Sequence, residues 1–294
     1  MRQGPGIVPR MIVAAWATIA FGQNTSWDDL DRDLAAGATL PALNRLPALL
    51  DSAHTSGDAV LIARATALGI ALSAHAHRVD PANAIANLEI ACGDATDGCR
   101  PILHAVLGNW YRVYLATHAD RIAPRLPPAT DPGPDIRGWD EPRLLSRIAT
   151  AYAEALAAAP ALQAVPVAPF ASVLNGSCVT DSPASNLLEF VLHDLLSLHT
   201  GRAYGAPADV AIHAPPASGP LLGSADEFIR WDSRPLGTNT PLQNAVAILQ
   251  RLMSLHREQS NHVALAELDR FRIQFASTQV RGPEIGRASC RERV

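Results

Sequence analysis

The chain has 294 residues, of which 48% are hydrophobic, 18% are charged and 5% are aromatic, and its formal net charge is -4. Such a composition is too apolar for a disordered acidic or basic tail, and without excess positive charge we expect no nucleic acid partner. All 24 basic residues are arginine, which excludes chemistry that needs a phosphate-loop lysine or a Schiff-base lysine.

Residues 1–22 have the pattern of a secretory signal peptide. Arg2 and Arg10 precede a 12-residue apolar stretch that ends with small residues at the positions a signal peptidase reads, Ala20 and Gly22. The stretch is shorter than the roughly 20 residues that cross a bilayer. We expect cleavage after Gly22 and a secreted or periplasmic protein with no membrane span. A buried N-terminal helix is the alternative.

Residues 23–121 are expected to form a first helical subdomain. Apolar residues recur at spacings of three and four, which favours helices. Ser26 is placed to cap the first helix and Gly37 to end it. Short connections between helices of this length place neighbours antiparallel. The further helices expected here cover residues 41–53, 58–77, 81–91 and 100–121.

Residues 122–138 contain five prolines and are expected to form a linker or an extended crossing, because proline lacks the amide that helix interiors need. A second helical subdomain is expected over 139–283. No single amphipathic helix here can be stable alone, so we expect one continuous body. The predicted fold class is all-α, with paired antiparallel helices in a TPR-like α-solenoid array. The expected helices cover residues 139–157, 182–198, 240–258 and 262–277, with a second Pro/Gly-rich connection over 201–223.

Cys92 and Cys99 flank a turn-forming hexapeptide between two predicted helices. In an oxidising compartment this spacing favours a structural disulfide, which would stabilise the fold by about 2–3 kcal/mol. Free thiols and a metal site are the alternatives. Cys178 alone cannot complete a zinc ligand set.

The ten histidines do not have metal-ligand or catalytic spacing. His75 and His77 lie on different faces of a helix, and His193 and His199 are six residues apart. No His-Glu-x-x-His motif and no Gly-x-Ser-x-Gly elbow occurs in the sequence. We therefore expect no catalytic residue, no metal and no cofactor, and a protein that is not an enzyme.

The most distinctive polar and aromatic cluster follows the Pro-rich segment and consists of Asp135, Trp139 and Asp140. We interpret it as a structural motif in which the tryptophan anchors the chain and the two acids cap helix N-termini. A binding site is the alternative.

Several sequence steps in a fixed order resemble the N-terminal helical region of large bacterial alpha-2-macroglobulin-like proteins. Residues 135–140 resemble an Asp-Ile-x-x-Trp step, and residues 187–193 resemble a Leu-Tyr-Asp-Phe-Leu-Ala-His helix. Residues 166–170 resemble a Pro-Ile-x-x-Tyr step, with Val167 and Phe170 in place of the commoner isoleucine and tyrosine. The resemblance covers roughly residues 85 to 275.

The resemblance implies a secreted or periplasmic protease trap built from β-sandwich domains, often with a Cys-Gly-Glu-Gln thioester. That tetrapeptide is absent from this sequence, and no run of strands is predicted. We therefore expect a non-catalytic helical module of such an endopeptidase inhibitor, with proteases as partners through domains outside this chain. Two alternatives stay open: a freestanding extracytoplasmic helical-repeat scaffold that binds partner proteins, and the N-terminal part of a secreted enzyme.

The last eleven residues, 284–294, resemble a translated sequencing-library adaptor. We expect them to be an artefact and exclude them from the fold. On this interpretation the natural chain continues beyond residue 283.

Overall fold

The computed structural model describes residues 26–125, 133–175, 184–204, 219–236 and 240–279. These residues form helices and short 3-10 turns without any strand, which confirms the predicted all-α class. One isolated bridge joins Pro166 to Asn186. The expected signal peptide over 1–22 and the adaptor-like segment over 284–294 lie outside the described residues.

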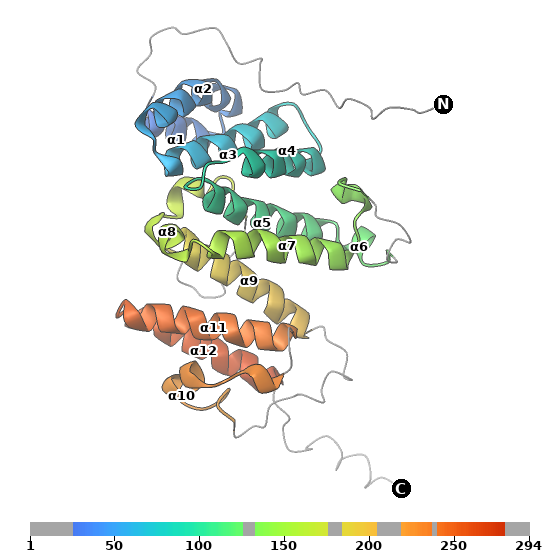
Figure 1. Ribbon diagram of the computed structural model, residues 1–294, viewed down its shortest axis with the longest axis vertical. Helices are drawn as coiled ribbons and strands as arrows, with labels where there is room; N and C mark the ends of the chain where they lie inside the picture. Colours follow the sequence, from blue (N-terminus) through green and yellow to red (C-terminus); the bar gives the residue numbers. More distant parts are fainter. Residues whose placement is uncertain (1–25, 126–132, 176–183, 205–218, 237–239, 280–294) are drawn as a thin grey trace.

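The helices are stacked along the long axis of the molecule (Figure 1). At one end lie α1 (Trp27–Ala35), α2 (Thr39–Ser56), α3 (Ala59–Ala76) and α4 (Pro81–Asp94). The middle contains α5 (Arg100–Thr117), α6 (Ala119–Ile122), η1 (Ile136–Gly138), α7 (Glu141–Leu156), α8 (Ala159–Ala164) and η2 (Ala168–Phe170). The other end contains α9 (Leu187–Tyr204), α10 (Ala225–Arg230), η4 (Arg234–Leu236), α11 (Pro241–Glu258) and α12 (His262–Gln279). The finer TPR-like arrangement stays a prediction.

Side-chain caps explain where several helices begin. Ser26 accepts a hydrogen bond from the amide of Asp29 at the start of α1, as predicted. Asp58 accepts from two amides of α3, and Thr240 caps α11 through the amide of Gln243. Each cap satisfies donors that the first helical turn leaves without a partner.

Some boundaries differ from the sequence prediction. The helix expected over 100–121 is interrupted at His118, where α5 ends and α6 begins. The helix expected from residue 182 begins at Leu187. The short helices α8 and α10 were not predicted, because six residues carry too little periodicity to be recognised.

The two predicted subdomains share one hydrophobic core. Helix α5 lies before the Pro-rich segment and α7 after it, yet they pack along each other more extensively than any other pair. The Tyr111 and Trp139 rings, one from each side, lie 6.0 Å apart between centroids. Within the described residues, helices from both sides of the Pro-rich segment therefore belong to one core. The expected linker or crossing over 122–138 lies partly outside the described residues and stays a prediction.

Helix α3 has the length and composition that a membrane-crossing helix needs, with 18 residues and a mean hydropathy of 1.5. It packs against α2, α4 and α5, and it contains the buried Arg64. Arg64 donates a hydrogen bond of 2.9 Å to the carbonyl of Pro169 and pairs with Asp31. Length and composition alone do not decide its environment, so the expected lack of a membrane span stays a prediction.

Candidate functional site

The predicted cluster around Trp139 makes structural contacts. Asp135 caps η1 by accepting from the amide of Arg137, and Asp140 caps α7 by accepting from the amide of Arg143. Trp139 is buried, and its Nε1 donates a hydrogen bond of 2.9 Å to the carbonyl of Gly133. These contacts fit the anchoring interpretation, because all three side chains are used to position the chain after the Pro-rich segment.

Cys92 and Cys99 do not form the expected disulfide in the structure. Both are buried free thiols. The Cys99 sulfur donates to the carbonyl of Ala59 at 3.4 Å and accepts from the Thr96 hydroxyl at 3.3 Å. Burial, with a smaller contribution from Glu89, raises the pKa of Cys92 to about 12. The turn between the two cysteines directs Cys99 toward the start of α3 instead of toward Cys92.

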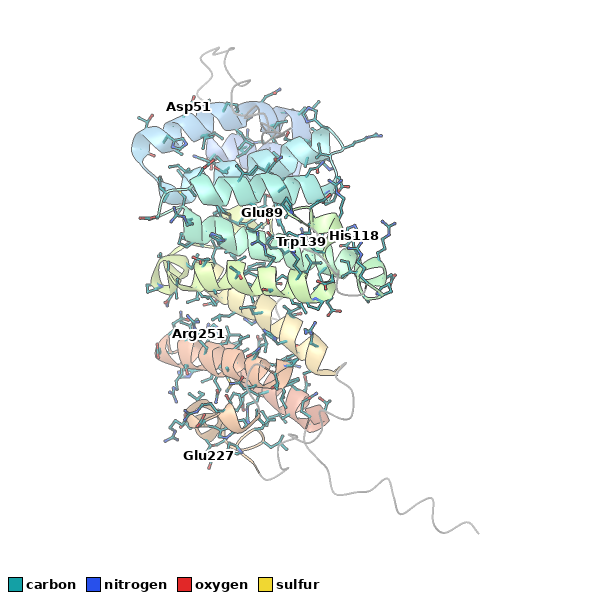
Figure 2. All side chains as sticks on the ribbon, turned by 45° about the vertical axis from the view of Figure 1, so that its right-hand side comes forward. Asp51, Glu89, His118, Trp139, Glu227 and Arg251 are labelled. Carbon is teal, nitrogen blue, oxygen red and sulfur yellow. The ribbon has the colours of Figure 1, made fainter. Side chains whose placement is uncertain are left out.

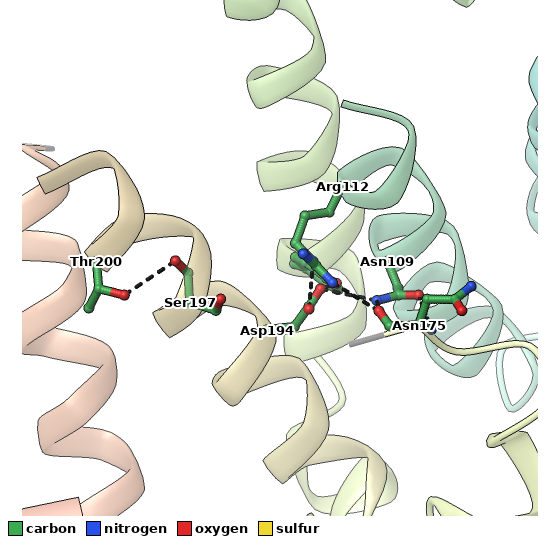
Figure 3. Close-up of polar contacts among 7 residues, drawn as sticks. Asn109, Arg112, Asn175, Asp194, Ser197 and Thr200 are labelled. Carbon is green, nitrogen blue, oxygen red and sulfur yellow. Dashed lines mark hydrogen bonds and ion pairs between the residues drawn. The ribbon is translucent and has the colours of Figure 1, made fainter. Parts of the chain in front are cut away.

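A buried polar network around Asp194 joins the middle helices (Figure 3). Asp194 lies on α9, and one of its carboxylate oxygens pairs with the Arg112 guanidinium on α5 at 2.5 Å. The other oxygen accepts from the Tyr152 hydroxyl on α7 and from the Asn109 amide on α5, the latter at 3.3 Å. The network therefore connects three helices from both sides of the Pro-rich segment.

Burial controls the protonation of this network. Burial raises the pKa of Asp194, whereas the Arg112 guanidinium opposes this shift. Burial and the adjacent Asp194 hold the pKa of Tyr152 well above its ordinary value. Tyr152 therefore stays protonated and donates to Asp194, so both carboxylate oxygens are occupied by protein donors.

Three residues of α5, Asn109, Trp110 and Arg112, also hold the segment that follows η2. The Trp110 Nε1 donates to the carbonyl of Val173 at 2.8 Å. Asn109 and Arg112 donate to the carbonyl of Asn175 at 2.6 and 2.9 Å. Asn109 also accepts from the amide of Asn175 at 2.9 Å. The network thus fixes the backbone of residues 173–175.

This fixed segment forms one wall of a groove of about 690 Å³, which we call the α3–α5 groove. Its volume lies within the range of about 300–1,000 Å³ that is usual for small-molecule sites. The floor is apolar and aromatic, and the rim is polar. The lining residues are Ala71, Ala74, His75, Arg78, Val79, Pro81, Ala84, Ile85, Trp110, Val113, Tyr114, Thr117, His118, Ser172, Val173 and Asn175.

Sequence reasoning missed both the network and the groove. Asp194 interrupts the leucine-rich stripe of α9, and an acid within such a stripe is a signal for a buried polar contact. Its partners Asn109 and Arg112 have no comparable signal. The groove combines residues from four separate segments, so no local pattern identifies it.

A pair of buried histidines lies between α9 and α11, which pack against each other. His193 and His256 are both 4% exposed, and neither Nδ1 has a hydrogen-bond partner among the described residues. Burial, assisted by the neighbouring His256, lowers the pKa of His193 to about 4. Within the described residues no group of three histidines, cysteines or acids could hold a metal ion.

Comparison with known proteins adds no family to these observations. No known protein family, no curated protein and no solved structure matches the chain.

Proposed function

We propose that this chain is a non-catalytic helical module that holds other parts of a larger extracytoplasmic protein in position. The observation that carries the proposal is the Asp194 network, which ties α5, α7 and α9 together across the Pro-rich segment. A buried charge that lost its partners would cost several kcal/mol, so the network favours one arrangement of these helices. A rigid arrangement is what a positioning module needs.

The chemistry of the groove supports a role without catalysis. None of its lining residues is a carboxylate or a cysteine. A pair of carboxylates for acid–base work and a thiol nucleophile therefore cannot be assembled from them. In the network, Asp194 is buried, one of its oxygens pairs with Arg112, and the other accepts from Tyr152 and Asn109, which fits a structural role for this carboxylate.

The sequence resemblance to bacterial alpha-2-macroglobulin-like proteins suggests the class of larger protein to which this module belongs. On that basis we propose that the module belongs to a secreted or periplasmic protease trap. Proteases would then be partners of domains outside this chain, and the helical module would position those domains.

A freestanding scaffold that binds partner proteins is the second candidate. The last described helix, α12, favours it, because Val263 and Ile273 on this helix are 67% and 38% exposed. Apolar side chains on an exposed helix face are a common feature of protein interfaces.

Sequencing of the gene beyond the codon for Pro283 separates the candidates. For the trap, we expect several thousand bases that encode repeated β-sandwich patterns. A stop codon shortly after this point would contradict the trap and favour the scaffold. A catalytic motif downstream would contradict both and favour the N-terminal part of a secreted enzyme.

A further inference from the structure

The α3–α5 groove has the features of a ligand site that none of the roles above uses. Its floor includes the buried Ile85 and Tyr114 and the half-buried Trp110. The hydrogen bond from Trp110 Nε1 to the carbonyl of Val173 fixes the orientation of the indole. A fixed aromatic floor provides a flat apolar surface on which a planar ring can stack.

The aromatic surface continues toward the end of α5. The rings of Tyr114 and His118 are stacked, with centroids 4.2 Å apart and an angle of 25° between their planes. His118 Nδ1 donates to the carbonyl of Tyr114 at 3.0 Å, which holds the imidazole in place. His118 lies where α5 leads into α6, at the side of the middle tier of the stack (Figure 2).

Among the described residues that line the groove, Arg78 is the only one with a permanent charge. Arg78 is exposed at the end of α3, and no ion pair joins it to an acid within the described part of the chain. The nearby acids Asp80 and Asp135 both lie beside another arginine, Arg137, at 3.8 and 3.4 Å. Because the described lining residues include this guanidinium and no carboxylate, the groove favours an anion over a cation.

The geometry points to the α3–α5 groove as a binding site for a small aromatic carboxylate. Its ring would lie against Trp110 and Tyr114, and its carboxylate would be bound by the guanidinium of Arg78 at the rim. Guanidinium groups match the planar shape of carboxylates and bind them through charge-assisted hydrogen bonds.

Three probes that share the indole ring system and differ in charge test this assignment: the anionic indole-3-acetate, the neutral indole-3-acetamide and the cationic tryptamine. Isothermal titration calorimetry of the full chain measures each dissociation constant. We expect indole-3-acetate to bind about tenfold more tightly than tryptamine, with the amide between them. Equal affinities for all three probes, or no binding of any of them, would overturn the assignment.

Two substitutions test the role of the rim. Arg78→Gly removes the charge, and because Arg78 has a φ of +52°, glycine adopts this backbone without strain. We expect it to weaken indole-3-acetate binding about tenfold and to leave indole-3-acetamide binding unchanged. Val79→Asp places a carboxylate at an exposed rim position and should have the same effect.

Arg251→Gln is the matched control, because it removes an exposed arginine on α11, on a different tier of the stack (Figure 2). It should leave the affinity for indole-3-acetate unchanged. Circular dichroism verifies that each variant is folded. If Arg78→Gly and Val79→Asp are both folded and both bind indole-3-acetate as the original chain does, the assignment is wrong. The test uses this chain alone, so its result and the outcome of sequencing beyond Pro283 are distinguishable.

Discussion

Gly108 lies in the middle of α5, directly against the ring of Tyr152 on α7. A Cβ atom at this position would lie 2.6 Å from Cδ1 and Cε1 of that ring. The ring cannot easily move aside, because its hydroxyl donates to the buried Asp194. The absence of a side chain at Gly108 therefore permits the close packing of α5 on α7.

Gly108→Ala should destabilise the protein although alanine is the better helix former. The helical preference favours alanine by about 1 kcal/mol, whereas overpacking of a dense core costs about 1–3 kcal/mol. We expect a net loss of up to about 2 kcal/mol in the free energy of unfolding, measured by urea denaturation.

Gly69→Ala in α3 is the control, because the nearest atom to a Cβ there is Leu46 Cδ1 at an ordinary 3.9 Å. This variant should be neutral or more stable by up to about 1 kcal/mol. If both alanine variants gain stability, α5 and α7 do not pack as closely as described.

His193 should make the protein less stable in mild acid. Its pKa is about 4 in the folded chain, against 6.5 ordinarily. Between these values the unfolded chain binds a proton that the folded chain does not, so the free energy of unfolding falls as the pH decreases from about 6.5 to about 4. The full effect is about 3 kcal/mol.

His193→Gln should remove this part of the pH dependence, measured by urea denaturation across this pH range. The difference between the pH slopes of the two proteins reports on His193 alone, because Asp194 is present in both. The raised pKa of Asp194 has the opposite effect on stability as the pH falls. Val191→Ala, in the same buried helix, should lower stability by the same amount at every pH. An unchanged pH slope in His193→Gln would contradict the assigned shift.

At the scale of an element, α10 and the turn before it are bound by one buried arginine from α12. Arg272 is 1% exposed, and it donates to the carbonyls of Leu221 and Gly223 at 2.7 and 2.8 Å. Its guanidinium lies 5.1 Å from the ring centroid of Phe228, and it also pairs with Asp269. A helix of six residues has little stability of its own, so these contacts hold α10 in place together with Gln250 of α11, which donates to the carbonyls of Phe228 and Trp231.

Arg272→Met should lower the free energy of unfolding by about 2–4 kcal/mol, because it leaves two carbonyls without their donors and removes a buried ion pair. Hydrogen exchange should increase first over residues 219–230. Arg251→Met, at an exposed position on α11, should change stability by less than about 0.5 kcal/mol. Equal effects of the two substitutions would show that Arg272 does not hold α10.

At the scale of the whole molecule, the shared core should make the two halves unfold together. The contact between α5 and α7 and the Asp194 network both cross the Pro-rich segment. Small proteins with one core unfold in a single cooperative transition. We expect the amides of α3 and α11 to lose protection from hydrogen exchange at the same urea concentration.

Asp194→Leu provides the comparison, because it removes the carboxylate that joins three helices and leaves the Arg112 guanidinium without its partner. The transitions of α3 and α11 should then separate or both shift to lower urea. Separate transitions in the original chain would mean that 23–121 and 139–283 are independent domains.

The sequence by itself determined which of the longer segments are helical and roughly where most of them begin. Periodicity and caps act over a few residues, so Ser26 and Thr240 predicted the starts of α1 and α11. The spacing of apolar residues by three and four likewise predicted the all-α class. The caps made by Asp135 and Asp140 and the hydrogen bond from Trp139 to Gly133 join residues close together along the chain, which is the range over which a sequence pattern is informative.

Only the tertiary structure decided which helices pack against each other. It thereby also decided which residues form the Asp194 network and the α3–α5 groove. Asn109, Tyr152 and Asp194 are separated by more than forty residues from one another, and no local pattern pairs them. The same dependence on tertiary contacts explains why the expected disulfide is not formed in the structure. The nearness of Cys92 and Cys99 in sequence says nothing about the contact of Cys99 with Ala59. Helix formation is governed by neighbours along the chain, whereas the groove and the network depend on how complete side-chain surfaces fit together.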